Sequence, residues 1–414
     1  MQEVPMSWKG VTVMDQRVRF ISEYLDGYFR VNELCGQFSI SRKTAYKWIH
    51  RYEEAGPKGL EDRSHRPHYC PHETDTYLID AIIEARLKHP TWGPKKLLQI
   101  ISPHYQELPA ISTTADILKR KGLIAPCKRR IRRAHPGCPK TTTNEPNDIW
   151  TADYKGHFKM GNSRYCYPLT VCDMHSRYLL GCDGHDAISL DQTKRYFTKL
   201  FSDYGLPWRI RTDNGVPFAS NAIARLSTLS VWWIKLGIFP EQIEPGKPQQ
   251  NGKHERMHRT LKKEATIPPE KNLTAQQQRF DAFREEYNTE RPHEALGMKT
   301  PASVYVVSPR TMPKKLDHFD YPYHFEVRRV SRNSGIRWRN RWVQVSRTLA
   351  EEYIGFEEIE DGIHNVYFCA LLIGRFFEEQ LKIRDVIERV PVRQTIVECG
   401  NPRTRRKVSP MYLE

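Results

Sequence analysis

The sequence has 414 residues, 39% of them hydrophobic, which is enough for several domains with compact cores. No stretch is long and apolar enough to span a membrane, so we expect no membrane contact. Lysine and arginine number 65 against 49 aspartates and glutamates, and the net charge of +16 favours a nucleic-acid partner, although a solvated basic surface is the simpler alternative. Nine scattered cysteines without a C-x-x-C pair indicate reduced, packed thiols, as expected in the cytoplasm.

Helical periodicity dominates residues 1–56, with one expected stripe at Val18, Ile21 and Leu25. Ser41 stands where an N-cap is expected before the last helix. The pattern predicts a helix-turn-helix domain. The outer face of its last helix would present residue types that contact phosphates and base edges: Arg42, Lys43, Tyr46, Lys47 and His50. A three-helix bundle with a merely charged face is the alternative.

Two further segments are rich in basic residues. After an expected linker at residues 57–73, residues 74–126 predict a second helix-turn-helix or winged-helix domain. Its last helix would have Ser112 as N-cap, Gly122 as stop, and Lys119 and Arg120 in the final turn. Residues 127–145 form a basic linker that either tracks a phosphate backbone or is simply flexible. The candidate contacts in this linker are Arg129, Arg130, Arg132 and Arg133.

Mixed periodicity in residues 146–308 predicts an α/β domain. The expected elements are strands at 149–154, 167–172, 178–182 and 209–212, a helix at 191–204, and a helix that opens near 253. This order puts Asp153 near the end of the first strand, Asp213 directly after the fourth, and Glu255 in the first turn of the last helix. Carboxylates gathered from distant segments repel one another, so such a fold normally holds divalent cations between them.

Several motifs in this region carry a family resemblance. The fragments Thr212-Asp213-Asn214-Gly215, Pro248 to Glu255, and Tyr287 to Leu296 with Thr300-Pro301 resemble the DDE catalytic core of retroviral integrases and bacterial insertion-sequence transposases. With the leading helix-turn-helix modules, the likeness covers most of the chain. It implies an RNase H-like fold in which Asp153, Asp213 and Glu255 bind two Mg²⁺ ions, with Mn²⁺ as a substitute. It also implies that water first cuts the element's end and that the freed 3′-hydroxyl then attacks target DNA.

Charged residues around these motifs fit a DNA substrate. Arg259 and Lys262 follow Glu255 by four and seven positions, so they share its helix face and could hold phosphates, unless they only form an exposed basic helix. Lys247 adds charge to the preceding loop. Two other acidic residues near strand ends lack the flanking motifs, and we interpret them as turn or surface residues: Asp173 and Asp183.

Two zinc alternatives remain open. The run from His254 to His258 reads H-E-x-x-H, which on a helix places two histidines one turn apart for Zn²⁺, as in a metalloprotease. Position 261 is leucine, so the extended protease motif is absent, and the basic flanks and two aspartates would stay unexplained. A second possible zinc set is loosely spaced: His65, His68, Cys70 and His72.

The C-terminal region differs from the rest. Short aromatic-rich strands separated by turn signals predict a small β-barrel at residues 320–390, followed by a basic tail at 391–414. The strands carry many arginines, which suits either an accessory DNA-binding domain or a domain that holds subunits together.

The resulting prediction is a multidomain α/β DNA transposase, bacterial, cytoplasmic and associated with the nucleoid. It would bind the terminal repeats of its insertion sequence in double-stranded DNA and cut and join strands with Mg²⁺. Joining two ends requires at least two protomers, so we expect a homo-oligomer on DNA. The alternative from another class is a transposase-derived regulator that binds DNA without catalysis.

Overall fold

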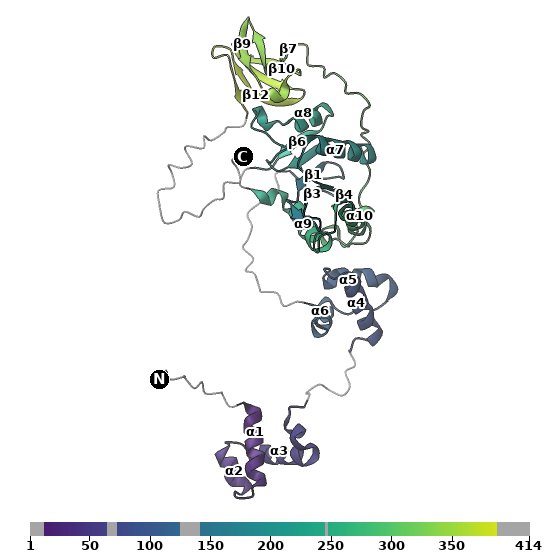
Figure 1. Ribbon diagram of the computed structural model, residues 1–414, viewed down its shortest axis with the longest axis vertical. Coiled ribbons are helices and arrows are strands. Elements are labelled where there is room, and N and C mark those ends of the chain that lie inside the picture. Colours follow the sequence, from purple (N-terminus) through teal and green to yellow (C-terminus); the bar gives the residue numbers. More distant parts are fainter. Residues whose placement is uncertain (1–11, 64–72, 125–140, 245–246, 387–414) are drawn as a thin grey trace, which may run out of the picture. The chain divides into compact units, whose positions relative to one another are not determined.

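The computed structural model describes residues 12–63, 73–124, 141–244 and 247–386 (Figure 1). The chain divides into two compact units at residue 74. Three sets of predictions lie outside the described residues: the four arginines at 129–133, the possible zinc set at 65–72, and the tail at 391–414. Within the described ranges, no helix combines the length and the apolar character needed to cross a bilayer.

The first unit is the predicted helix-turn-helix. It consists of α1 (Val13–Leu25), α2 (Val31–Gln37) and α3 (Arg42–Ala55). Ser41 is the N-cap of α3, because its hydroxyl accepts a hydrogen bond of 3.2 Å from the Thr44 N–H, as predicted. The core holds Phe20, Ile21, Leu34, Trp48 and Ile49, among others. The expected stripe on α1 is wrong at two positions, since Val18 and Leu25 are exposed and Phe20 is buried beside Ile21.

The second helical module comprises α4 (Thr76–Lys88), α5 (Pro94–Ile101) and α6 (Ile111–Arg120). Its core contains Ile82, Trp92, Leu97 and Ile117. The predicted N-cap Ser112 is wrong: the N-cap is Ala110, so α6 begins two residues earlier than predicted. Between residues 73 and 124 no strand forms a wing.

A mixed sheet forms the centre of the second unit (Figure 1). Its strands are β1 (Ile149–Tyr154), β2 (Phe158–Lys159), β3 (Tyr165–Asp173), β4 (Leu179–His185), β5 (Arg209–Thr212) and β6 (Phe239–Gln242). β3 pairs with β1 and β4 antiparallel, whereas β1, β5 and β6 are parallel neighbours. β6 was not predicted, because Pro240 and two polar residues hide the strand pattern, and proline is tolerated at a sheet edge.

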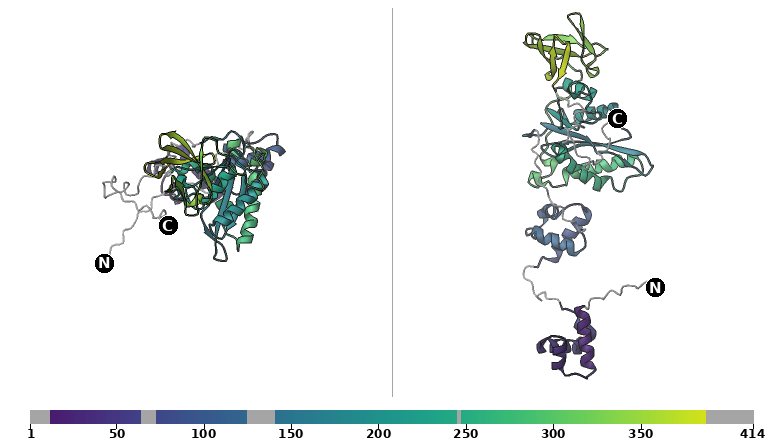
Figure 2. Two further views of the ribbon diagram at one scale, coloured as in Figure 1. Left: turned by 90° about the horizontal axis from the view of Figure 1, so that it is seen from above. Right: turned by 90° about the vertical axis from the view of Figure 1, so that its left-hand side faces the viewer.

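Helices cover both faces of this sheet (Figure 2). On one face α7 (Leu190–Tyr204) and α8 (Thr228–Lys235) pack against Trp150, Ala152 and other strand residues. On the other face lie α9 (Gly252–Ala265) and α10 (Leu273–Thr289), which pack through Leu261 and Phe280 against cysteines of β3 and β4. Successive strand residues point to opposite faces, so the residues that alternate with Trp150 and Ala152 face α9.

The C-terminal strands form an open sheet in the order β13-β12-β11-β10-β7, and β8 and β9 form a separate hairpin. Their bounds are β7 (Glu326–Arg329), β8 (Gly335–Trp338), β9 (Arg341–Gln344), β10 (Tyr353–Glu360), β11 (Ile363–Phe368), β12 (Leu371–Phe377) and β13 (Lys382–Asp385). The predicted small β-barrel is not confirmed, because the end strands β7 and β13 do not pair with each other. Strand patterns reveal which segments are extended, but not which edges meet.

This sheet shares an apolar cluster with α8, one of the helices that cover the central sheet. Val231 and Ile234 of α8 pack with Ile354 and Phe376 of the C-terminal strands. At the edge of the cluster Lys235 forms an ion pair of 2.8 Å with a glutamate of the C-terminal region, Glu352. The C-terminal sheet is therefore attached to the core by shared burial.

Candidate active site

Strand pairing brings Asp153 and Asp213 to the same edge of the central sheet. β1 and β5 are parallel neighbours with Thr151 opposite Arg211, so their carboxyl ends meet. Asp153 is the fifth residue of β1, and Asp213 directly follows β5. Alternation from the buried Trp150 and Ala152 places Asp153 on the face covered by α9. Glu255, in the first turn of α9, completes the set from a third segment.

Asp153 lies close enough to Asp213 and Glu255 to respond to their charges. Burial, followed by the negative charge of Asp213, raises the pKa of Asp153 to about 7, and Glu255 adds to the same effect. Burial also raises the pKa of Asp213, against a hydrogen bond of 3.2 Å from the Gly215 N–H. Glu255 itself is exposed. The structure thus places Asp153 within reach of the negative charges of the other two predicted acidic residues.

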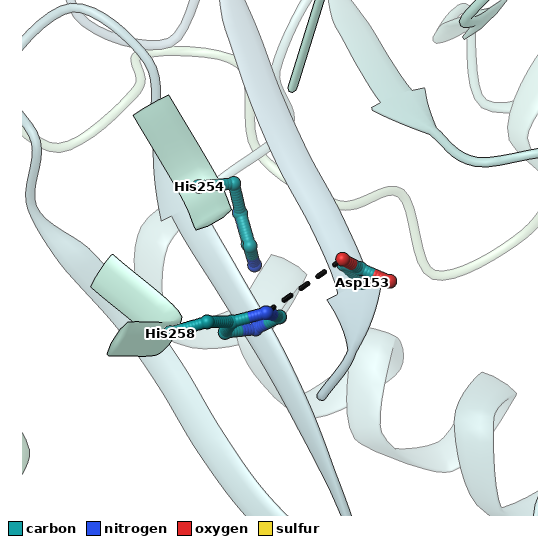
Figure 3. A group of neighbouring side chains, drawn as sticks. All are labelled: Asp153, His254 and His258. Atoms are coloured by element: carbon teal, nitrogen blue, oxygen red, sulfur yellow. Dashed lines mark ion pairs between the residues drawn. The ribbon is translucent and has the colours of Figure 1, made fainter. Parts of the chain in front are cut away.

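The face of α9 that meets the sheet carries two buried histidines (Figure 3). Nδ1 and Nε2 of His254 lie 2.8 Å from the Thr151 hydroxyl and 2.7 Å from the Thr170 hydroxyl. Nε2 of His258 lies 2.7 Å from the same Thr170 hydroxyl, and its Nδ1 lies 3.7 Å from Asp153 Oδ2. Burial lowers the pKa of His254 to about 3, and burial with the neighbouring His254 lowers the pKa of His258. Both rings are therefore neutral at pH 7.

This geometry argues against the metalloprotease alternative. In a zinc protease both histidines of H-E-x-x-H bind the metal and keep a nitrogen free for it. Here each nitrogen of His254 is engaged by a threonine hydroxyl, so His254 has no nitrogen free for a metal ion. The charge of Glu255 instead acts on Asp153 of β1.

A buried ion pair lies beside the start of α9, the helix that carries Glu255. The sequence analysis did not predict it. Arg211, two residues before Asp213, lies 2.6 Å from Glu241 of β6, and both side chains are buried. The Arg211 guanidinium also donates 3.3 Å hydrogen bonds to the carbonyls of Gln250, just before α9, and of Thr141. The ion pair thus connects the strand of Asp213 to the start of the Glu255 helix. A single charged residue inside a short strand gives no signal of such pairing.

The predicted basic residues near Glu255 are accessible. Arg259 and Lys262 are exposed on α9, and Lys247 is exposed in the preceding loop and pairs with Glu244. The interpretation of Asp173 as a turn or surface residue is wrong, because Asp173 is the last residue of β3 and its side chain is buried. It accepts hydrogen bonds from the N–H of Ser176 and of a second residue, Asn147, at 2.7 and 2.8 Å. The same interpretation is wrong for Asp183, which lies inside β4, is half-buried and lies 2.9 Å from His185.

The predicted contact face of α3 is exposed at every position named for it. These side chains are Arg42, Lys43, Tyr46, Lys47 and His50. The opposite side of the helix is buried through Ala45, Trp48 and Ile49. Lys119 and Arg120 are likewise exposed in the last turn of α6.

Comparison with known protein families agrees with this architecture. Residues 143–248 and 236–301 match families described as integrase core domains. Residues 16–68 match a helix-turn-helix domain, and residues 44–118 match a homeodomain-like domain.

Curated relatives come from bacterial insertion elements. The InsD transposase of an Escherichia coli insertion element is 26% identical over 252 residues, which cover 56% of this chain and 78% of that protein. An uncharacterized insertion-element protein of Xanthomonas euvesicatoria is 26% identical over 59% of this chain and 69% of its own length.

Two solved structures show weaker likeness. The catalytic core domain of HTLV-2 integrase, solved with magnesium, is 18% identical, with a TM-score of 0.32, over 39% of this chain and 98% of that one. A simian T-cell lymphotropic virus intasome chain is 15% identical, with a TM-score of 0.35, over 75% of this chain and 100% of that one. Scores this low do not establish a shared fold.

The integrase core and the transposase relatives define the class as a DDE-type polynucleotidyl transferase. Enzymes of this class use divalent metal ions. With its DNA-binding helix-turn-helix domain, the chain is a DNA transposase of the insertion-sequence type, within the integrase-like superfamily.

Proposed function

We propose that this transposase binds the terminal repeats of its own insertion sequence and carries out Mg²⁺-dependent strand cleavage and strand transfer at Asp153, Asp213 and Glu255. The observation that carries the proposal is the convergence of these carboxylates: the carboxyl ends of β1 and β5 meet, and the charges of Asp213 and Glu255 both act on Asp153. The pKa of Asp153 is raised to about 7, in part by the charges of Asp213 and Glu255, although the three residues come from distant segments. A site that gathers repelling charges is suited to cations.

The residues present fit divalent ions. Asp153, Asp213 and Glu255 offer carboxylate oxygens, the ligands that Mg²⁺ and Mn²⁺ prefer. These three side chains would hold two Mg²⁺ ions in an RNase H-like core, with Mn²⁺ as a substitute. Bound there, the ions would lower the pKa of the attacking water or 3′-hydroxyl and stabilise the leaving oxygen.

The protein's own side chains would bring DNA to the carboxylates. Arg259 and Lys262 stand four and seven positions after Glu255 on an exposed helix face, where they would bind phosphates beside the cluster. Lys247 would add a contact from the preceding loop. The exposed face of α3 would read the terminal repeat in the major groove, with further phosphate contacts from Lys119, Arg120 and the four arginines of the basic linker.

Strand transfer of two ends requires at least two protomers, so we propose a homo-oligomer assembled on DNA. The C-terminal region, with exposed Arg328 and Arg329 on β7 of its sheet and Arg341 on β9 of its hairpin, would contribute DNA or subunit contacts. Closure of the C-terminal sheet into a barrel would require further strand pairing when the oligomer assembles.

The test is incubation of the full chain with labelled double-stranded DNA from the element's ends, with and without Mg²⁺. Metal-dependent nicking followed by joining supports the proposal. Glu255→Gln should bind the same DNA and leave it intact. DNA binding without cleavage under Mg²⁺ or Mn²⁺ would instead indicate a transposase-derived regulator.

A further inference from the structure

Thr170 determines which ring nitrogens of the two buried histidines carry protons. Its hydroxyl lies 3.1 Å from the backbone carbonyl of Asp153 and 2.7 Å from Nε2 of both His254 and His258. A hydroxyl has one proton to donate, and a carbonyl can only accept. All three hydrogen bonds therefore form together in one way: Thr170 donates to the Asp153 carbonyl, and both Nε2–H groups donate to Thr170.

The remaining nitrogen of each ring has a different environment. The Thr151 hydroxyl lies 2.8 Å from Nδ1 of His254 and 3.3 Å from the Cys172 carbonyl, and it donates its proton to the nearer acceptor, Nδ1. Nδ1 of His258 faces Asp153 Oδ2 at 3.7 Å, and Figure 3 shows this ring turned toward the carboxylate. In a neutral ring with its proton on Nε2, the Nδ1 atom that faces Asp153 bears a lone pair.

Two lone-pair atoms that face each other in a buried site are stabilised by a cation between them. Two metal–ligand bonds of about 2.0–2.2 Å can span the distance between His258 Nδ1 and Asp153 Oδ2. Asp153, His254 and His258 are a group, within the described part of the chain, whose potential ligand atoms all lie within 4.8 Å of one another. Glu255 lies three positions before His258, so the two are neighbours on α9.

We propose that His258 Nδ1 is an additional ligand of the divalent ion held by Asp153 and Glu255, so that this centre combines nitrogen and oxygen donors. The proposal rests on the metal-binding role proposed above for the carboxylates. His254, with both nitrogens engaged by threonines, takes no part. Imidazole raises the preference for Mn²⁺ over Mg²⁺ relative to a site of oxygens alone.

Pulsed electron paramagnetic resonance of Mn²⁺ bound to the full chain tests this directly. The expected spectrum contains the nitrogen coupling of a coordinated imidazole. That coupling should change when the histidines are labelled with ¹⁵N, disappear in His258→Gln, and persist in the matched control His254→Gln. Titration should show Mn²⁺ affinity falling by about tenfold or more in His258→Gln, with a smaller loss for Mg²⁺.

The possible failures are distinguishable. Bound Mn²⁺ without nitrogen coupling, or with coupling unchanged in His258→Gln, overturns the role of His258 while the carboxylate site stands. Mn²⁺ binding that is unchanged in Asp153→Asn overturns the carboxylate site itself. If His258→Gln does not fold, the ¹⁵N-labelled unsubstituted protein still decides whether any histidine binds the ion, and His254→Gln decides whether it is His254.

Discussion

The helix-turn-helix unit and the candidate active site are built in opposite ways. The candidate DNA contacts of the first unit all lie on α3, between Arg42 and His50. The acidic cluster draws Asp153, Asp213 and Glu255 from two strands and a helix, and their approach depends on the register of β1 with β5. A surface for DNA recognition can thus be formed by the residues of a single helix, whereas a site with several carboxylates requires the whole sheet to be assembled.

The largest effect that tests this contrast is expected from Asp213→Asn. Loss of one carboxylate should lower cleavage on the order of 10⁴-fold, the scale seen when a catalytic group is removed. Binding to the element's ends should stay within about twofold, because α3 lies in the other unit. Gel-shift and nicking assays on the same preparation measure both quantities. Parallel loss of binding and cleavage would contradict the division between the two regions.

Breaking the buried ion pair of Arg211 and Glu241 should destabilise the core. Arg211→Met leaves the Glu241 carboxylate buried without its partner, which costs roughly 3–5 kcal/mol of unfolding free energy. Urea unfolding, with hydrogen exchange of the amides of β1 and β5 as the probe, measures the loss of unfolding free energy. The double variant Arg211→Met with Glu241→Leu is the control, since removing both charges should restore much of the stability. α3 should show unchanged protection in either variant.

The acidic cluster should also make stability depend on pH. Asp153 ionises near 3.8 in the unfolded chain and near 7 in the folded core, so in this window the folded state holds the extra proton. Raising the pH from about 4 to about 7 therefore removes stability through this group. His254, whose pKa is lowered from 6.5 to about 3, acts in the opposite direction. The informative quantity is thus the difference in free energy of unfolding between the unsubstituted protein and Asp153→Asn, measured without metal by urea unfolding at each pH. This difference should grow as the pH rises and shrink when Mg²⁺ is added.

On the helix-turn-helix side, the double substitution Arg42→Ala and Lys47→Ala should weaken binding without altering the chemistry. Each phosphate contact that is lost should reduce the slope of log K against log salt by about 0.9. Fluorescence anisotropy over a series of salt concentrations measures the slope. Arg19→Ala, an exposed arginine on α1, is the matched control and should change it less. An unchanged slope in the double variant would exclude α3 as the phosphate-binding face.

The smallest expected effect is local to the start of α3. Ser41→Ala removes the side-chain acceptor of the Thr44 N–H and should cost about 1 kcal/mol. Ser41→Asp keeps an acceptor and should lose little. Thermal unfolding of the first unit measures the change, and cleavage of pre-bound DNA should not respond.

The elements that follow one periodicity were predictable from the sequence. β1 and β5 have the predicted bounds, and the N-cap Ser41 is correct. The N-cap Ser112 was wrong because the actual N-cap, Ala110, makes no side-chain hydrogen bond, so no residue type signals the start of the helix. Val18 was expected in the core because a stripe of three positions cannot tell which side of α1 the other helices cover.

The candidate site was only partly predictable. The motifs pointed to the three carboxylates, but nothing in the sequence showed that Arg211 reaches Glu241 or that Thr170 contacts both histidines. Such contacts depend on which strands are neighbours and on their register. The H-E-x-x-H match was misleading for the same reason, because short motifs do not say which side chains face the sheet.

The apolar cluster shared by α8 and the C-terminal strands limits how evolution can recombine this protein. Val231 and Ile234 are part of the same cluster as Ile354 and Phe376, so neither side has a complete interior without the other. A recombination event that exchanged only the C-terminal sheet between related elements would join two surfaces that had not been selected together. The inherited unit is therefore the core with its C-terminal sheet, whereas the first helix-turn-helix has its own interior and could be exchanged without leaving either part incomplete.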